Sequence, residues 1–92
     1  MKLCVPIPCF FPCSTTEQFI AAIHKSAELG YTAVETYDWR MLDTSAVKST
    51  LEDTGVELCS ILVMENRLTT PDCRDLWLTS LRETCEAAAK MN

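Results

Sequence analysis

The chain has 92 residues, of which 48% are hydrophobic, and its 13 acidic side chains outnumber 8 basic ones to give a formal net charge of -5. This length predicts one small domain with a limited core, and the few, scattered basic residues exclude an electrostatic match to nucleic acid. No run of about 18 apolar residues is present to cross a membrane, so we expect a soluble, cytoplasmic protein.

The first predicted element is a strand over residues 2–9, where apolar side chains alternate along the chain. Pro6 and Pro8 lack backbone donors, so they place this strand at a sheet edge or cut it short. The same prolines argue against a secretory leader, because the apolar region of a leader is normally able to form a helix. Residues 10–13 then form a loop that leads into the first helix.

The second element is a helix over residues 15–29. Ser14 and Glu17 match a capping box, in which the hydroxyl accepts from the backbone near Glu17 and the carboxylate reaches back. The apolar stripe of this helix consists of Phe19, Ile20, Ile23 and Ala27. Gly30 follows the helix at a position where a left-handed cap would turn the chain into the next strand.

The same joint between helix and strand occurs a second time. A strand over 32–39, rich in β-branched and aromatic residues, is followed by a helix over 44–54 that has Asp43 as its N-cap and stops before Gly55. The strand over 56–65 is almost continuously apolar, which indicates a strand covered on both faces, as in a parallel sheet.

The last predicted element is a helix over 71–91, with Thr70 as its cap and Pro71 at its first position. Its buried stripe is predicted to consist of Trp77, Leu81, Cys85 and Ala88. Strands that alternate with amphipathic helices predict an α/β fold of three βα units, with a parallel sheet and right-handed crossovers. The outer strands of such a sheet would expose unpaired backbone, which invites association.

The segment AVETYDWR, residues 33–40, resembles a distinctive part of a known family. The matching parts are Met1 to Leu3, Phe10 and Phe11, Leu29 to Tyr31, and Ala33 to Arg40. Together they resemble the N-terminal part of the hydroxypyruvate isomerase-like branch of the xylose isomerase-like TIM barrels, the sugar phosphate isomerase/epimerase superfamily. Because a complete barrel needs about 250 residues in eight units, the resemblance implies that residues 1–92 form a single, partial TIM-barrel domain.

The resemblance also implies a chemistry whose main groups lie outside this chain. Members of the family bind a divalent metal through side chains of the later strands, and two of those carboxylates move a proton between neighbouring carbons of a small hydroxy-keto or sugar substrate. No catalytic or metal-binding residue therefore transfers to this sequence, and no cofactor is expected in this chain, although a complete family member is expected to hold a divalent metal. The 92-residue chain is expected to be an inactive segment of such an isomerase or epimerase.

What the resemblance transfers is a substrate-facing rim, because active-site groups of TIM barrels lie at the C-terminal ends of the strands. The rim residues predicted to line a substrate are Phe10, Phe11, Glu35, Tyr37, Trp39, Glu65 and Asn66. Strand alternation places Glu35, Tyr37 and Trp39 on one face and Val34 on the other. Three of these residues have a structural alternative: Glu35 as an interior acid paired with a cation, Trp39 as packing against the loop after the first strand, and Asn66 as ordinary turn chemistry.

The other polar residues near the rim have plain structural interpretations. Asp38 and Arg40 are expected to form a local ion pair or to be solvated charges. His24, the only histidine, lies in the middle of a predicted helix and is expected at the surface, because no nucleophile and base surround it.

The six cysteines do not form a recognisable motif. The spacing C-x4-C-x3-C followed by three isolated cysteines lacks the paired knuckles of a zinc site, and the C-x-x-C motif of redox proteins is absent. A disulfide framework needs an oxidising compartment, which nothing in the sequence supports. We therefore expect buried free thiols that pack as small hydrophobes.

Two other functions remain open at the level of sequence. One is a non-catalytic assembly or interaction module that completes its sheet by self-association. The other, less favoured, is a cysteine-rich metal or redox module.

Overall fold

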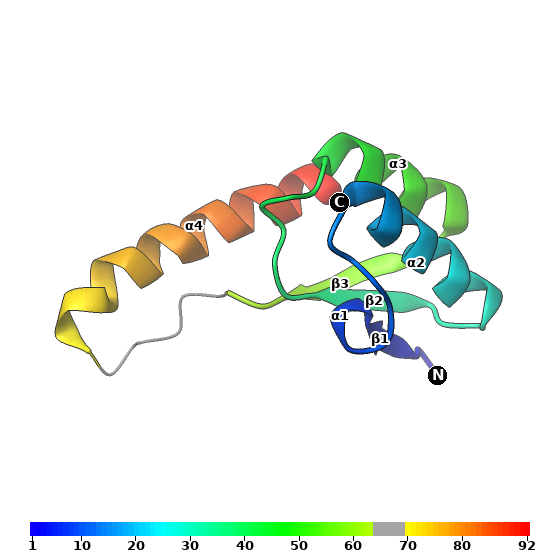
Figure 1. The fold of residues 1–92 in the computed structure, drawn as a ribbon, viewed down its shortest axis with the longest axis horizontal. Helices are drawn as coiled ribbons and strands as arrows, with labels where there is room; N and C mark the ends of the chain where they lie inside the picture. Colours follow the sequence, from blue (N-terminus) through cyan, green and yellow to red (C-terminus); the bar gives the residue numbers. More distant parts are fainter. Residues whose placement is uncertain (64–69) are drawn as a thin grey trace.

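A computed structural model describes residues 1–63 and 70–92, and it alternates strands and helices as the sequence predicts (Figure 1). The elements in chain order are β1 (Cys4–Pro6), α1 (Ile7–Phe10), α2 (Thr16–Glu28), β2 (Ala33–Thr36), α3 (Thr44–Thr54), β3 (Glu57–Ile61), the 3-10 turn η1 (Pro71–Cys73) and α4 (Arg74–Met91). The predicted helix over 44–54 is confirmed to the residue.

The three strands form one parallel sheet in the order β1-β2-β3. The three long helices, α2, α3 and α4, all lie on the same face of this sheet (Figure 1). The predicted α/β class with a parallel sheet is therefore confirmed. Consecutive strands are neighbours, so each helix carries the chain back along one face to start the next strand beside the last one.

The core lies between the sheet and the three long helices. Val34 in the central strand is fully buried, and its register partners Val5 and Leu58 are buried on the same face. Phe19 and Ile23 of α2 pack against these strand residues in the same cluster. Alternation along β2 thus directs Val34 and its register partners toward the helices, while the opposite face is not covered by α2, α3 or α4.

The strands are shorter than the sequence predicts. The predicted strand over 2–9 is wrong beyond Pro6, because Ile7–Phe10 forms a helical turn. Pro8 lies in the first turn of α1, where its fixed φ suits a helix and its missing N–H costs no hydrogen bond. Of the predicted strand over 32–39, Ala33–Thr36 forms β2, and of the strand over 56–65, Glu57–Ile61 forms β3, with residues 64 and 65 outside the described residues.

The N-cap of α2 lies one residue later than the sequence predicts. Thr15, not Ser14, is the N-cap of α2, and its side chain accepts a hydrogen bond from the Gln18 backbone at 3.2 Å. The Gln18 amide oxygen in turn accepts from the backbone N–H of Ser14 at 2.8 Å. Gln18 therefore takes the role given to Glu17, but its side chain accepts from the residue before the N-cap and not from the N-cap itself, as it would in a capping box.

The start of α3 and both glycines follow the prediction. Asp43 caps α3 by accepting from the backbone N–H groups of Ser45 and Ala46 at 3.0 and 3.2 Å. Gly30 and Gly55 have φ angles of 90° and 72°, a conformation that residues with a Cβ adopt at a cost. Gly55 is the left-handed cap of α3, with its N–H bonded to the Leu51 carbonyl at 2.9 Å.

The predicted buried face of the last helix is wrong by about one residue. The residues of α4 that are buried are Ser80, Thr84, Ala87 and Met91, whereas Trp77, Leu81 and Ala88 are half-buried and Cys85 is exposed. Small polar residues can face the core here because their hydroxyls are bonded: Thr84 donates to the Ser80 carbonyl at 2.7 Å and accepts from Trp39. The first half of α4 projects past the end of the sheet (Figure 1).

The start of this helix also differs from the prediction. Residues 71–73 form the 3-10 turn η1, and the α-helix begins at Arg74. Thr70 is the N-cap of η1, as predicted, but its side chain makes no capping hydrogen bond.

Candidate functional site

Polar and sulfur-bearing side chains gather on the sheet face that α2, α3 and α4 do not cover. The register pairs Cys4 with Ala33 and Pro6 with Glu35, and paired residues of parallel strands point to the same face. Because Val34 points toward the helices, Cys4 and Glu35 point away from them. We call this surface the open face of the sheet.

Strand β3 adds a second thiol to the open face. The register between β2 and β3 shifts between Val34 and Glu35, so that Leu58 pairs with Val34 but Ser60 pairs with Glu35. Cys59 is the extra residue, and its Sγ lies 3.0 Å from the Sγ of Cys4 and 3.4 Å from the carbonyl oxygen of Val34. Because Leu58 points toward the helices, alternation turns Cys59 to the open face, where thiols from the two outer strands meet.

The thiol of Cys4 holds its proton more tightly than an ordinary cysteine. Desolvation, then the hydrogen bond to Cys59, and then the negative charges of Cys59 and Glu35 raise the pKa of Cys4 from 9.0 to about 11. All of these causes disfavour the thiolate. At neutral pH, Cys4 is thus a protonated thiol that can donate a hydrogen bond to its neighbour.

A second pair lies farther along the open face, where the chain leaves β2. The Sγ of Cys9 in α1 lies 2.9 Å from the phenolic oxygen of Tyr37. This hydrogen bond, and after it desolvation and the charges of Cys9 and Glu35, raise the pKa of Tyr37 above its usual value. Glu35 acts electrostatically on both Cys4 and Tyr37, so the half-buried carboxylate lies between the two pairs.

The structure brings only some of the predicted rim residues together. Glu35 and Tyr37 share the open face, whereas Phe10 is 71% exposed and Phe11 packs against the core beside α2. Trp39 does not continue the face of Glu35, because β2 ends at Thr36 and strand alternation ends with it.

Trp39 instead turns toward α4 and packs against the core. Its indole N–H donates to the Thr84 hydroxyl at 3.0 Å. Glu65 and Asn66, the two remaining rim residues, lie outside the described residues.

The interpretations of Asp38, Arg40 and His24 are confirmed. The guanidinium of Arg40 lies 3.6 Å from the Asp38 carboxylate, and Asp38 also accepts from the Arg40 backbone at 3.0 Å. The same guanidinium lies over the Trp39 ring at 5.5 Å from its centroid. His24 is exposed on α2.

The prediction of buried thiols is wrong. All six cysteines are free, and each is either exposed or half-buried. For Cys4 and Cys59 the reason is their place on the open face, which α2, α3 and α4 do not cover. Sequence spacing could not find their contact, since the two residues are 55 positions apart and meet only through the strand order and register.

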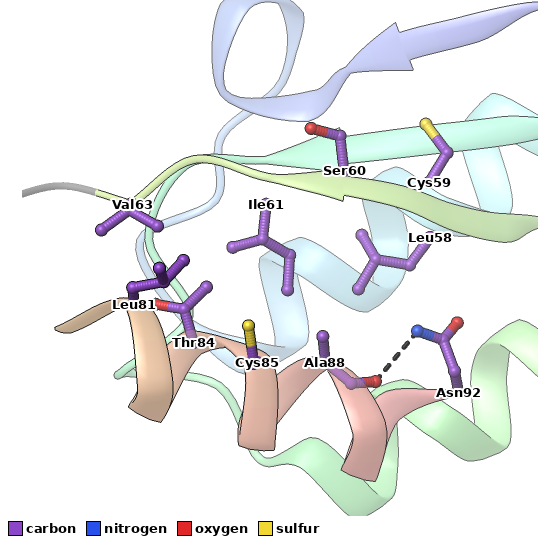
Figure 2. Close-up of a pocket in the computed structure, with 10 residues that line it drawn as sticks. All are labelled: Leu58, Cys59, Ser60, Ile61, Val63, Leu81, Thr84, Cys85, Ala88 and Asn92. Carbon is purple, nitrogen blue, oxygen red and sulfur yellow. Dashed lines mark hydrogen bonds between the residues drawn. The ribbon is translucent and has the colours of Figure 1, made fainter. Parts of the chain in front are cut away.

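An apolar groove runs between β3 and α4 (Figure 2). It has a volume of about 220 Å³, and its apolar lining includes Leu58, Ile61, Val63, Leu81 and Ala88. Within the described residues β3 is the last strand of the sheet. The half-buried side chains of α4 therefore face a groove beside an unpaired strand edge.

The described residues supply no ready metal centre. Within residues 1–63 and 70–92, no group of three or more His, Cys, Asp or Glu side chains is placed to hold a metal ion. In the same residues, no helix is long and apolar enough to cross a membrane.

No protein family, curated protein or solved structure was found to match this chain.

Proposed function

We propose that this chain forms the first three βα units of an incomplete (βα)8 barrel, and that it is an N-terminal segment of a hydroxypyruvate isomerase-like enzyme. The observation that carries the proposal is the strand order β1-β2-β3 with all three long helices on one face. In a doubly wound sheet the strand order reverses and helices cover both faces. A barrel winds in one direction and keeps every helix outside.

The groove beside α4 supports the same arrangement. In a barrel, the fourth strand pairs with the outer edge of the third and packs under the helix between them. The groove between β3 and α4 offers such a position, with an unpaired edge on one side and apolar side chains on the other. Asn92 lies near Glu57 at the start of β3, so a strand that followed α4 would run parallel to β3.

The side chains of the open face are compatible with the interior of a barrel. The side chains that point away from the helices, Cys4 and Glu35 among them, would face the barrel interior. Glu35 and Tyr37 would lie near a small hydroxy-keto or sugar substrate. The residues described supply neither the metal site nor the pair of carboxylates that the reaction needs, so the 92-residue chain alone is expected to be inactive.

The proposal is tested by measuring the size and the activity of the protein that carries this sequence in cells. An antibody raised against residues 1–63 should detect a polypeptide of about 250 residues, and this protein, once purified, should isomerise hydroxypyruvate in the presence of a divalent metal. Glu35→Gln should lower turnover or weaken substrate binding, and His24→Gln, on the exposed surface of α2, should change neither. A single species of 10.3 kDa would sink the proposal.

Self-association of the chain is a second candidate function, and a specific observation favours it. Both outer strands have unpaired edges within the described residues, and Leu76 and Leu78 on the projecting half of α4 are 54% and 41% exposed. A partner of the same sequence could cover these surfaces. Light scattering after size exclusion tests this function: it predicts a defined multiple of 10.3 kDa, and a monomer at high concentration dismisses it.

A further inference from the structure

The contact between Cys4 and Cys59 spans a complete strand. The two residues belong to β1 and β3, which flank β2, and their Sγ atoms lie 3.0 Å apart. Strands two positions apart in a flat sheet are separated by about 9.5 Å. The side chains of the outer strands must therefore converge over β2 on the open face.

Three features of the structure produce this convergence. Alternation after Leu58, which points toward the helices, turns Cys59 to the open face, and the register between β2 and β3 shifts at this residue. Ala33, the β2 residue paired with Cys4, has only a methyl group there and is 4% exposed. An ion pair between Lys2 and Glu57, with an N–O distance of 3.2 Å, links the same two strands at the start of the sheet.

We propose that Cys4 and Cys59 form a thiol–disulfide exchange site on the open face, whose substrates are small exposed disulfides such as oxidised glutathione. Both cysteines are exposed and free, so a soluble disulfide can reach them. This inference does not rest on the proposed isomerase function, and it concerns the chain in which the open face is exposed, because in a complete barrel this face would line the packed interior.

The exchange takes place in two balanced steps. One thiol loses its proton, and the thiolate attacks a sulfur of the small disulfide to form a mixed disulfide, which releases the first glutathione thiolate. The second thiol then loses its proton and attacks the protein sulfur of the mixed disulfide, which releases the second glutathione thiolate. Two electrons pass from the protein thiols to the small disulfide, and a Cys4–Cys59 disulfide results.

The geometry favours the second step over accumulation of the mixed disulfide. The sulfurs need to move together by about 1 Å to reach bonding distance, and the backbones of β1 and β3 need to close to the Cα separation of about 7 Å that a disulfide allows. An intramolecular attack benefits from a high effective concentration. Because the bridge would join strands two positions apart and would remain exposed, it is expected to be readily reduced. Protonation of Cys4, whose pKa is raised to about 11, makes the exchange faster at alkaline pH.

The other four cysteines make a matched control possible. Cys9 has a tyrosine hydroxyl as its close partner, and the structure places no other thiol pair in contact within the described residues. A chain that keeps only Cys4 and Cys59, with serine at the other four positions, should cross-link. A chain that keeps only Cys9 and Cys85 should form mixed disulfides or cross-link between molecules.

The test is equilibration of both chains and the wild-type chain in glutathione redox buffers, followed by acid trapping, alkylation of free thiols and peptide mapping by mass spectrometry. We expect an intramolecular Cys4–Cys59 disulfide. Its fraction should fall as the squared concentration of reduced glutathione, divided by the concentration of oxidised glutathione, rises, as a two-electron couple requires. Mixed disulfides alone, links between molecules, or unmodified thiols in excess oxidised glutathione would each overturn the proposal.

A second variant separates the contact from general cysteine reactivity. Ala33→Leu places a larger side chain between the two thiols and should lower the exchange equilibrium constant by about ten-fold, equal to about 30 mV. Far-ultraviolet circular dichroism of this variant reports whether the fold is kept. If it is not, binding of phenylarsine oxide to the wild-type chain supplies the deciding measurement: bridging of Cys4 and Cys59 by one arsenic supports the site, and failure to protect both from alkylation contradicts it.

Discussion

Replacing Gly55 with L-alanine or with D-alanine tests the left-handed cap of α3, because the two substitutions should change the free energy of unfolding in opposite directions. Gly55 has φ of 72° and ψ of 9°, and a Cβ built at this position would meet no heavy atom within 4 Å. The cost of an L side chain is therefore backbone strain alone, about 1–2 kcal/mol. Loss of unfolded-state entropy offsets about 0.4–1 kcal/mol of this cost, so Gly55→Ala should lower the free energy of unfolding by about 1 kcal/mol.

D-alanine at position 55 should have the opposite effect. Its preferred φ is positive, so the strain disappears while the entropic gain remains, and the free energy of unfolding should rise by about 0.4–1 kcal/mol. Ser49, exposed in the middle of α3, is the matched control, because there D-alanine should destabilise by about 1–2 kcal/mol and L-alanine should not. Urea unfolding of the semisynthetic chains, followed by circular dichroism, measures all four changes. A destabilising D-alanine at position 55 would refute the left-handed cap.

Three further predictions concern the N-cap of α3, the core and the open face. Asp43→Ala should lower the free energy of unfolding by about 1 kcal/mol, because two backbone donors lose their acceptor. Urea unfolding measures this change, and the exposed Asp53→Ala is the control that should show almost none. Val34→Ala, at a fully buried site, should cost about 2 kcal/mol, and an equal loss for half-buried Val63→Ala would contradict the described core. Thiolate absorbance in a chain that keeps only the thiol pair should show Cys4 titrating near pH 11, not at its ordinary pKa of 9.0. Because the unfolded chain loses that proton first, stability should decrease as pH rises from 9.0 toward 11.

The sequence predicted best those elements whose signals are local. The helix over 44–54 has its N-cap and its glycine stop within the chain segment itself, and its bounds are confirmed. The prediction for α2 missed only its cap, since Ser14 and Thr15 can both supply a hydroxyl and the choice depends on which residue is extended. The prolines correctly indicated a short first strand, although not the helical turn that follows it.

The sequence predicted the candidate site less well because the site depends on contacts between distant segments. Glu35 and Tyr37 share the open face as expected, but Trp39 leaves it once β2 ends and bonds to Thr84 of α4. The hydrophobic stripe chosen for α4 was also wrong, because hydrophobicity alone could not show that Thr84 and Ser80 would find hydrogen-bond partners in the core.

The amino-acid sequence by itself determined the alternation of strands and helices, the α/β class and both glycine joints, since these depend on local periodicity, capping and backbone preference. Only the tertiary structure decided that Cys4 and Cys59 meet and that the thiols are not buried. Their contact depends on the strand order and on the parallel register. Strand order and register decide which distant residues share a face of the sheet, and neither follows from spacing along the chain.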